Sequence, residues 1–561
     1  MKRILPEWVF DVIGWMIYGG LMTIYLPMYA LGYLTIRKNI AKLKLLKFLG
    51  FKSNKAKLGL VSRRSRVTDI SEVSAEEEID FQSHRSLGYV HRMTLWTPKE
   101  IVKAILGRQK LNLISDEQLA YVILATTFSH AVKWDEKRKM FCLSMLELQN
   151  YFLFQGFYWD ARQIFVDADG SRIIIQMDDG SEFSSDCEPA QRSDYKLAKL
   201  HAQVCLSYFA PGLSHNYVHF VFPSAVCVLA KNKLNHQSTL YKLLSPHFRF
   251  TERINYQALK VGKATSNRQT LIDRFFFFWQ PFPITREQFV ENVAVKCKNY
   301  YHECGSPDYR TELRTRSATR LPSVVEEDNT ERNHFLFPPA YVTKKDMQKL
   351  PYMAFLAEYY FVVRRFVKAM EPFIDKSEWK MLAEEISVHV PRFNQVNMVD
   401  AIATFIHQVG VVHFCDHDSY VRYFAYKYGC MTIRAPFESF ESEDHWKNVC
   451  HQMGLELNAV KKDPLLLLSQ TDIMRARCFI NLFVDYIPNP NLDLRLTSTE
   501  YNFDQVGPQE AAMDFLAQLE ALDSKLKKEK CPINIPVNRG EPRSVGTQIT
   551  RLNDMIRSVC F

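Results

Sequence analysis

The sequence predicts a mainly α-helical protein that carries one small β-hairpin and is preceded by a single transmembrane helix. Three observations support this class. Residues 12–36 contain no charged side chain, amphipathic helical stretches dominate from Thr97 onward, and one pair of short strands flanks an Asp-Gly turn. The 561 residues are enough for two domains, although one large helical enzyme domain also fits this length. We expect an N-terminal anchor over 1–36, a basic segment and linker over 37–96, and one large domain over 97–561.

The N-terminal stretch from Val12 to Ile36 has the length and composition of a membrane span. It covers 25 residues, from 12 to 36, and about 20 apolar residues suffice to cross a bilayer as a helix. A cleaved signal peptide would have a shorter apolar core and a small-residue cleavage site, which this stretch lacks. A re-entrant or surface-lying segment is the other alternative. Aromatic rings favour the membrane interface and lie towards both ends, at Trp8, Trp15, Tyr29 and Tyr33.

A run of positive charge follows the predicted span. Eleven lysines and arginines lie between positions 37 and 66, and no acidic residue interrupts them, whereas only Lys2 and Arg3 precede the span. Cytosolic flanks of membrane spans carry the excess of basic residues, so we expect the body of the protein to face the cytosol. We expect the basic residues to contact anionic lipid headgroups rather than nucleic acid.

The spacing of the cysteines predicts neither a zinc site nor a set of disulfides. The chain has 12 of them, with no Cys-x-x-Cys motif and no regular spacing. A structural zinc knuckle and a disulfide scaffold are therefore both poor interpretations. We expect mostly reduced, buried thiols.

Local signals place two elements near the start of the large domain. Ser115 is expected to cap a helix, with Gln118 three residues later completing a capping box. Residues 162–167 and 172–177 flank the Ala-Asp-Gly-Ser turn at 168–171. Because Asp-Gly is a strong turn signal, these two strands are predicted to form a β-hairpin.

Two histidine pairs are the candidates for chemistry. His215 and His219 are four residues apart, and so are His413 and His417. On a helix this spacing stacks both imidazoles on one face, where they can reach one metal ion. A single such pair is expected by chance among 16 histidines and is often a hydrogen-bonded core histidine. Two pairs, the second following the apolar stretch 401–412, favour a metal site.

The residues beside the second pair leave two possibilities open. Asp416 and Asp418 either orient the histidine ligands through hydrogen bonds or are simply solvated. Imidazole ligation by itself suits iron, zinc or copper. The pairs alone therefore predict a transition metal without naming it.

A longer motif indicates which protein family the chain resembles. The stretch from His236 to Asn255 reads H-Q-S-T-L-Y-K-L-L-S-P-H-F-R-F-T-E-R-I-N. It resembles the lipoxygenase family, whose chains carry H-P-[IL]-[FY]-K-L-L-x-P-H-x-R-x-T-x-x-I-N at this place. The resemblance extends in patches from about Leu111 to Phe561. Further segments that follow the family's order are the hairpin Ala161–Met177, the helix start Leu197-Ala198-Lys199, the second ligand helix Ile402–His417 and the returning C-terminus Arg543–Phe561.

The resemblance implies a helical catalytic domain around a non-haem iron. In the family, three histidines, a fourth Asn or His and the C-terminal carboxylate bind the iron. His413 and His417 match the pair on the second ligand helix, and Phe561 matches the residue that supplies its main-chain carboxylate. The N-terminal β-sandwich of animal and plant members has no counterpart here, so the membrane helix is expected to take over its docking role.

The first pair departs from the family pattern. The family's first two ligands are five residues apart, and the position matching the first of them falls near residues 208–210, where there is no histidine. We expect His215 and His219 to bind together, because four apart is the natural spacing on an unbulged helix. The alternative is that one ligand is lost. A second alternative concerns the tail, because Glu541–Val545 also resembles the family's terminus and would make Phe561 part of an extension.

The function that the resemblance implies is a membrane-anchored dioxygenase. It would take a hydrogen atom from a bis-allylic carbon of a polyunsaturated acyl chain and add dioxygen to the resulting radical, with iron preferred over manganese as the cofactor. The expected partners are a lipid or fatty-acid substrate, dioxygen and the membrane, and not nucleic acid. One alternative is a membrane-tethered scaffold of the same fold with a degraded site, and another is a metal oxygenase acting on a different lipophilic substrate. A membrane histidine-box hydroxylase is excluded, because it needs several spans and clustered HxxHH motifs.

Overall fold

The computed structural model describes the large domain in several separate stretches. These are residues 111–126, 128–129, 132–145, 158–209, 218–219, 222–251, 351–387, 393–414, 416, 429–430, 433–470, 473, 495–528 and 557, together with single residues at 16, 20, 23, 34, 38 and 41. The predicted membrane span and basic segment therefore lie almost wholly outside them. Within the described residues, no helix combines the length and the apolar composition needed to cross a bilayer.

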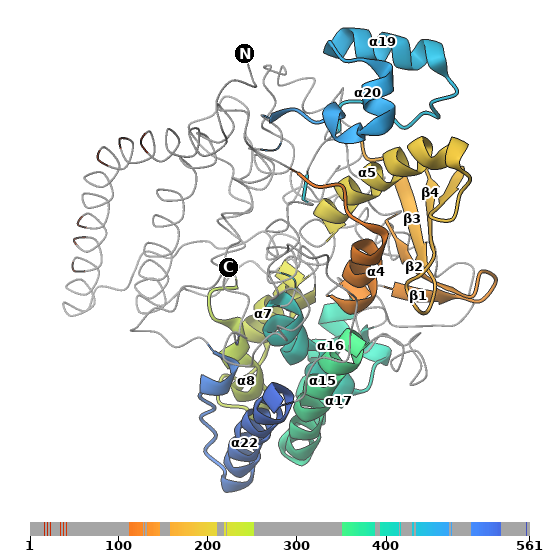
Figure 1. Ribbon diagram of the computed structural model, residues 1–561. Coiled ribbons are helices and arrows are strands. Elements are labelled where there is room, and N and C mark those ends of the chain that lie inside the picture. The colour runs from red at the N-terminus through yellow and green to blue at the C-terminus, as the bar shows by residue number, and fades with distance from the viewer. Residues whose placement is uncertain are drawn as a thin grey trace.

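The described part is mainly helical, as the sequence predicts, and its one antiparallel sheet is larger than the single predicted hairpin. The sheet lies at one side of the molecule, and a group of helices packs at its lower end (Figure 1). The α-helices are α4 (Asp116–Ala125), α5 (Arg192–Tyr208), α7 (Phe222–Lys233), α8 (Thr239–Leu244), α15 (Pro351–Met370), α16 (Lys376–Ser387), α17 (Met398–His407), α19 (Glu443–Met453), α20 (Leu457–Lys462) and α22 (Val506–Lys528).

The sheet is a five-stranded meander. Its strands pair in chain order and are β1 (Val132–Asp135), β2 (Met140–Ser144), β3 (Ala161–Val166), β4 (Ile173–Met177) and β5 (Glu182–Ser184). Strands β3 and β4 are the predicted hairpin, and Gly170 in its turn has a φ of +77°, which glycine adopts without strain. Because side chains alternate, Ile164 and Ile175 face the main core, while Phe165 and Ile174 join a small cluster on the other face.

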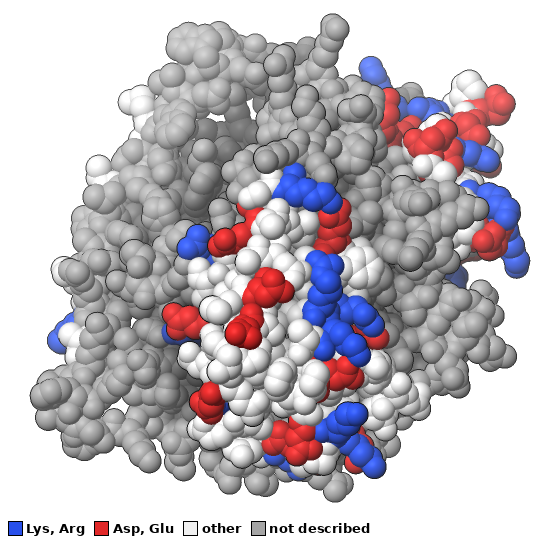
Figure 2. Space-filling model, turned by 90° about the horizontal axis from the view of Figure 1, so that it is seen from below, with Lys and Arg blue, Asp and Glu red and all other residues white. Residues whose placement is uncertain are grey.

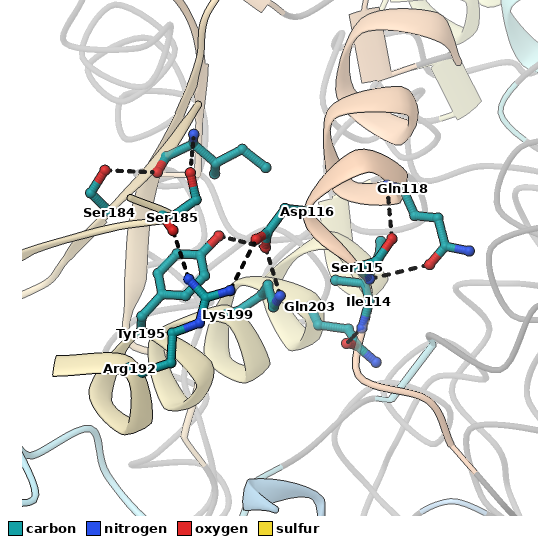
Figure 3. A network of polar contacts seen from close by, with 11 residues as sticks. Ile114, Ser115, Asp116, Gln118, Ser184, Ser185, Arg192, Tyr195, Lys199 and Gln203 are labelled. Atoms are coloured by element: carbon teal, nitrogen blue, oxygen red, sulfur yellow. Dashed lines mark hydrogen bonds and ion pairs between the residues drawn. The ribbon is translucent and has the colours of Figure 1, made fainter. Parts of the chain in front are cut away.

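Helix α5 crosses the sheet and is attached to α4 by a polar network (Figure 3). The Oδ1 atom of Asp116 accepts hydrogen bonds from the Tyr195 hydroxyl at 2.7 Å and from Nζ of the buried Lys199 at 2.6 Å. The predicted capping box at the start of α4 is present, since Ser115 and Gln118 exchange hydrogen bonds between side chain and backbone. The expectation of a helix start at 197–199 is wrong, because α5 already begins at Arg192.

The lower group consists mainly of α15, α17 and α22. The rings of Phe366 in α15 and Phe515 in α22 stack with centroids 4.4 Å apart. Arg364 of α15 and Asp400 of α17 form an ion pair at 2.6 Å. The space-filling view from below shows basic and acidic side chains interspersed over the described surface (Figure 2).

The described cysteines agree with the sequence prediction. All of them are free thiols, and most are buried. They are Cys142, Cys187, Cys205, Cys227, Cys430 and Cys450.

Candidate metal centre

Helix α17 leads directly into the second histidine pair. Asn397 caps its N-terminus by accepting from the Val399 N–H at 2.9 Å, and every residue of the helix except Asp400 is buried. The chain then continues as a π-helix over Gln408–Val412, in which the His413 N–H donates to the Gln408 carbonyl five residues earlier. Such a turn holds one extra residue and therefore changes the face that the following side chain occupies. This local distortion sets the direction of the His413 ring.

His413 meets His219 in the interior of the protein. Their Nε2 atoms lie 2.9 Å apart, and their ring centroids are 4.8 Å apart with the planes at 67°. His219 is 3% exposed and His413 is 0% exposed. The fold therefore places one histidine of each predicted pair, His219 and His413, in contact with each other. The other members, His215 and His417, and the predicted ligand Phe561 lie outside the described residues.

The distance between the two Nε2 atoms fits binding to a single metal ion. Two imidazole nitrogens that bind one ion at about 2.1 Å and at a right angle to each other lie about 3.0 Å apart. The same distance also suits a hydrogen bond, in which one Nε2–H donates to the other ring's lone pair. Within the described ranges, no group of three or more His, Cys, Asp and Glu side chains converges. The described centre thus consists of two buried imidazoles, and their described neighbours along the chain include buried apolar side chains, namely Val218, Phe222, Val409, Val411 and Val412.

Asp416 lies one turn beyond His413 and is buried. Its exposed fraction is only 1%, so the alternative of a solvated side chain is wrong for this residue. Within the described ranges it does not join His219 and His413 in a group of three side chains that could hold a metal ion. Asp418, the other carboxylate considered from the sequence, lies outside the described residues.

His407, six residues before His413, has a different role. Its Nε2–H donates to the Leu356 carbonyl at 3.0 Å, and its ring meets Tyr360 edge-on. Complete burial lowers the pKa of His407 to about 3, so the ring is neutral at physiological pH. The hydrogen bond to Leu356 fastens α17 to α15.

His201 is a second buried histidine that the sequence reasoning did not single out. Its Nδ1 accepts the Asp160 N–H at 3.2 Å, and burial lowers its pKa to about 3. Desolvation raises the pKa of the neighbouring Asp160 carboxyl to about 6. This pair lies where α5 crosses the sheet and fixes α5 against the start of β3.

The C-terminal segment returns to the core at Arg557. This residue is 8% exposed, and its carbonyl oxygen lies 2.7 Å from Nδ1 of His247. The guanidinium of Arg557 also donates to the Ser498 carbonyl at 3.2 Å. The tail is therefore anchored well beyond Glu541–Val545, which argues against a loose extension after that segment. His247 belongs to the Ser-Pro-His-Phe part of the motif between His236 and Asn255. Because the lipoxygenase motif has a histidine at this position, the sequence alone could have marked His247 as a candidate.

Comparisons with known proteins give a consistent answer at the level of the fold. No family model and no curated protein sequence matches the chain. Among solved structures, a lipoxygenase with an internal deletion matches with a TM-score of 0.58 and 11% identity, over 95% of this chain and 82% of that chain. A coral 8R-lipoxygenase matches with a TM-score of 0.56 and 12% identity, over 90% and 79%. The manganese lipoxygenase of Gaeumannomyces graminis matches with a TM-score of 0.51 and 12% identity, over 95% and 92%. The chain has the lipoxygenase fold.

Proposed function

We propose that the protein is a metal-dependent dioxygenase of the lipoxygenase type that oxygenates a polyunsaturated acyl chain. The observation that carries this proposal is the buried approach of His219 and His413, whose Nε2 atoms lie 2.9 Å apart within a lipoxygenase fold. One of the lipoxygenases with this fold was solved in complex with arachidonate, which supports a fatty acid as the substrate class.

The proposed ligands come from three parts of the chain. His219 and His413 are the described ones, and we propose His215, His417 and the main-chain carboxylate of Phe561 as the others. When bound, a redox-active transition metal supplies one-electron chemistry, through which a hydrogen atom leaves a bis-allylic carbon and dioxygen adds to the carbon radical. The π-helix directs the His413 imidazole, and burial keeps water away from both rings.

We propose iron as the metal. Imidazole nitrogens together with a carboxylate suit non-haem iron, whereas a site richer in oxygen ligands would favour manganese. One of the similar structures is a manganese lipoxygenase, which makes manganese the alternative ion. Elemental analysis distinguishes them directly.

We also propose that the enzyme works at a membrane surface. The uncharged stretch 12–36 would anchor it, and the basic residues between 37 and 66 would contact anionic lipid from the cytosolic side. An acyl substrate could then pass from the bilayer into the protein without crossing water.

One observation favours the scaffold alternative. The position that matches the family's first ligand falls at the end of α5, where Phe209 is buried with its ring 5.5 Å from that of Phe128. An apolar contact thus occupies a place where the family has a metal-binding imidazole. A site that has lost one ligand could keep the fold without the chemistry.

Metal content and oxygen consumption separate these two functions. The full-length protein is purified, its metals are quantified, and oxygen uptake is recorded with arachidonate. The double variant His219→Ala/His413→Ala is compared with His236→Ala, an exposed histidine whose Nε2 lies 3.0 Å from the Lys231 carbonyl. Near-stoichiometric iron and oxygen uptake that only the double variant loses support the dioxygenase. Wild-type protein without metal or uptake supports the scaffold.

A further inference from the structure

Three buried groups from distant parts of the chain form one hydrogen-bonded chain. His247 lies in the 3₁₀ turn Ser245–Phe248, and Tyr501 lies in the segment that precedes α22. Nε2 of His247 is 2.8 Å from the Tyr501 hydroxyl, and Nδ1 is 2.7 Å from the Arg557 carbonyl oxygen. His247 is 1% exposed and Tyr501 is 3% exposed.

Only one arrangement of protons satisfies both hydrogen bonds of a neutral His247. A carbonyl oxygen can only accept, so Nδ1 carries the hydrogen and donates to Arg557. Nε2 then presents its lone pair and accepts the hydroxyl hydrogen of Tyr501. Burial lowers the pKa of His247 to about 4, which keeps the ring neutral and this tautomer in place at physiological pH.

The ring of His247 is also connected to the two ligand helices. It meets the ring of Phe405 edge-on, with centroids 6.2 Å apart. Phe405 lies in α17, eight residues before His413, and its ring also meets Phe222 at 6.2 Å, three residues after His219. One aromatic side chain thus contacts both His247 and the helix that follows the first histidine pair.

We propose that His247 is a positioning residue for the metal centre: together with Tyr501 it clamps the main chain at Arg557, four residues before the proposed ligand Phe561. This inference rests on the proposed function, in which the carboxylate of Phe561 is a ligand. The clamp itself is independent of any metal.

The register at Arg557 matters because a ligand must stay at bonding distance from its metal. A slip of one residue at Arg557 would shift the chain by about 3.8 Å, and the proposed carboxylate ligand with it. A shift of this size exceeds the length of a metal–oxygen bond, about 2.1 Å.

Substitutions at His247 can separate its two hydrogen bonds. In His247→Asn the side-chain amide nitrogen lies near the place of Nδ1 and can still donate to Arg557. In His247→Gln the amide reaches the place of Nε2 and can still contact Tyr501. His247→Leu keeps the volume and loses both contacts, Tyr501→Phe removes one hydroxyl, and His236→Asn is the exposed control.

Two measurements are made on each full-length variant. Hydrogen exchange of the C-terminal peptide is followed in the metal-free protein, and iron affinity is determined by titration with ferrous iron. We expect the peptide to exchange about 5-fold to 100-fold faster in His247→Leu, because a buried carbonyl loses its donor. Iron affinity should fall about 10-fold to 100-fold in the same variant. His247→Asn should recover both properties more fully than His247→Gln, and His236→Asn should match the wild type.

The outcomes distinguish the clamp from the proposed function. Unchanged exchange of the C-terminal peptide in both His247→Leu and Tyr501→Phe overturns the clamp. Faster exchange with wild-type iron affinity overturns the positioning role while leaving the dioxygenase intact. A wild-type protein that binds no iron overturns the proposed function, and exchange alone then decides whether His247 holds the tail. Where His247→Leu unfolds globally, seen as fast exchange in β3 and β4, Tyr501→Phe decides.

Discussion

The Nε2 atoms of His219 and His413 lie 2.9 Å apart although 194 residues separate the two histidines in the sequence. Two neutral imidazoles at this distance form one hydrogen bond, in which the N–H of one ring donates to the lone pair of the other. A metal ion instead binds the lone pairs of both nitrogens. Metal binding and the hydrogen bond therefore exclude each other. The single most informative substitution is one that removes either ring.

We predict that His413→Ala abolishes metal binding and oxygen uptake, whereas His407→Ala does not. His407 is bonded to the Leu356 carbonyl through Nε2, so its loss should lower the free energy of unfolding by about 1–3 kcal/mol and leave most of the metal in place. Elemental analysis and urea unfolding of both variants check this. Equal metal content in His413→Ala and the wild type would refute the site.

The stability of the protein should fall as the pH is lowered below about 6.5. His201, His247 and His407 have folded-state pKa values of about 3, 4 and 3, against 6.5 when unfolded. Between pH 6.5 and 4 the unfolded state therefore binds protons that the folded state does not, and stability present above 6.5 is lost as the pH falls. Asp160 acts in the opposite direction, because its folded pKa of about 6 exceeds its ordinary value of 3.8.

Between pH 6 and pH 5 these four groups together give the unfolded state about two more bound protons than the folded state, so the free energy of unfolding should fall by roughly 3 kcal/mol per pH unit. Urea unfolding at pH 6 and pH 5 measures this slope. His407→Gln keeps an amide donor for Leu356 but cannot titrate, so it should roughly halve the slope. A slope in His407→Gln identical to that of the wild type would show that His407 is protonated in the folded state.

Two turn glycines provide a matched pair for backbone strain. Gly170 and Gly180 both have positive φ angles, +77° and +88°, and alanine at either should cost about 1–2 kcal/mol. A Cβ at Gly170 would also lie 3.2 Å from the Cβ of the buried Ala120, whereas nothing lies within 4 Å at Gly180. We therefore predict that Gly170→Ala destabilises more than Gly180→Ala in urea unfolding. Equal losses of stability in the two variants would mean that the contact with Ala120 is relieved at no cost.

Membrane anchoring remains a prediction from the sequence. Full-length protein in microsomes should resist carbonate extraction, and external protease should digest its body. Lysine at both Leu21 and Ile24 should release it, since a lysine at the centre of a span costs about 3 kcal/mol. Release of the wild-type protein by carbonate, or protection of its body in sealed microsomes, would contradict the span or its orientation.

The sheet shows which local signals can be read from a sequence. The β3–β4 hairpin was predicted because Asp-Gly marks its turn, and the same dipeptide at Asp179-Gly180 marks the missed turn into β5. The β1–β2 turn has no glycine, and Lys139 adopts the positive φ of 56° there. A charged lysine carries no signal for that conformation, so this hairpin could not be inferred.

The centre shows the limit of spacing arguments. The four-residue spacing marked His219 and His413 as candidates, but which member of each pair meets the other depends on tertiary packing. The π-helix before His413 changes the helix face on which the following residues lie. Its sequence, Gln-Val-Gly-Val-Val, does not predict a π-helix. The clamp between His247 and Arg557 joins residues 310 positions apart, which no local pattern encodes.

The final prediction concerns the carboxylate of Phe561, which we propose as a ligand. Appending one glycine moves the terminal carboxylate by one residue, about 3.8 Å along the backbone. Because Arg557 is held by His247, the preceding chain cannot slide to take up the extra residue. We therefore expect the glycine-extended protein to lose iron and oxygen uptake, whereas Phe561→Ile, which keeps the carboxylate in place, should retain both. Wild-type iron content and uptake in the extended protein would remove the carboxylate from the ligand set and leave the centre to the histidines alone.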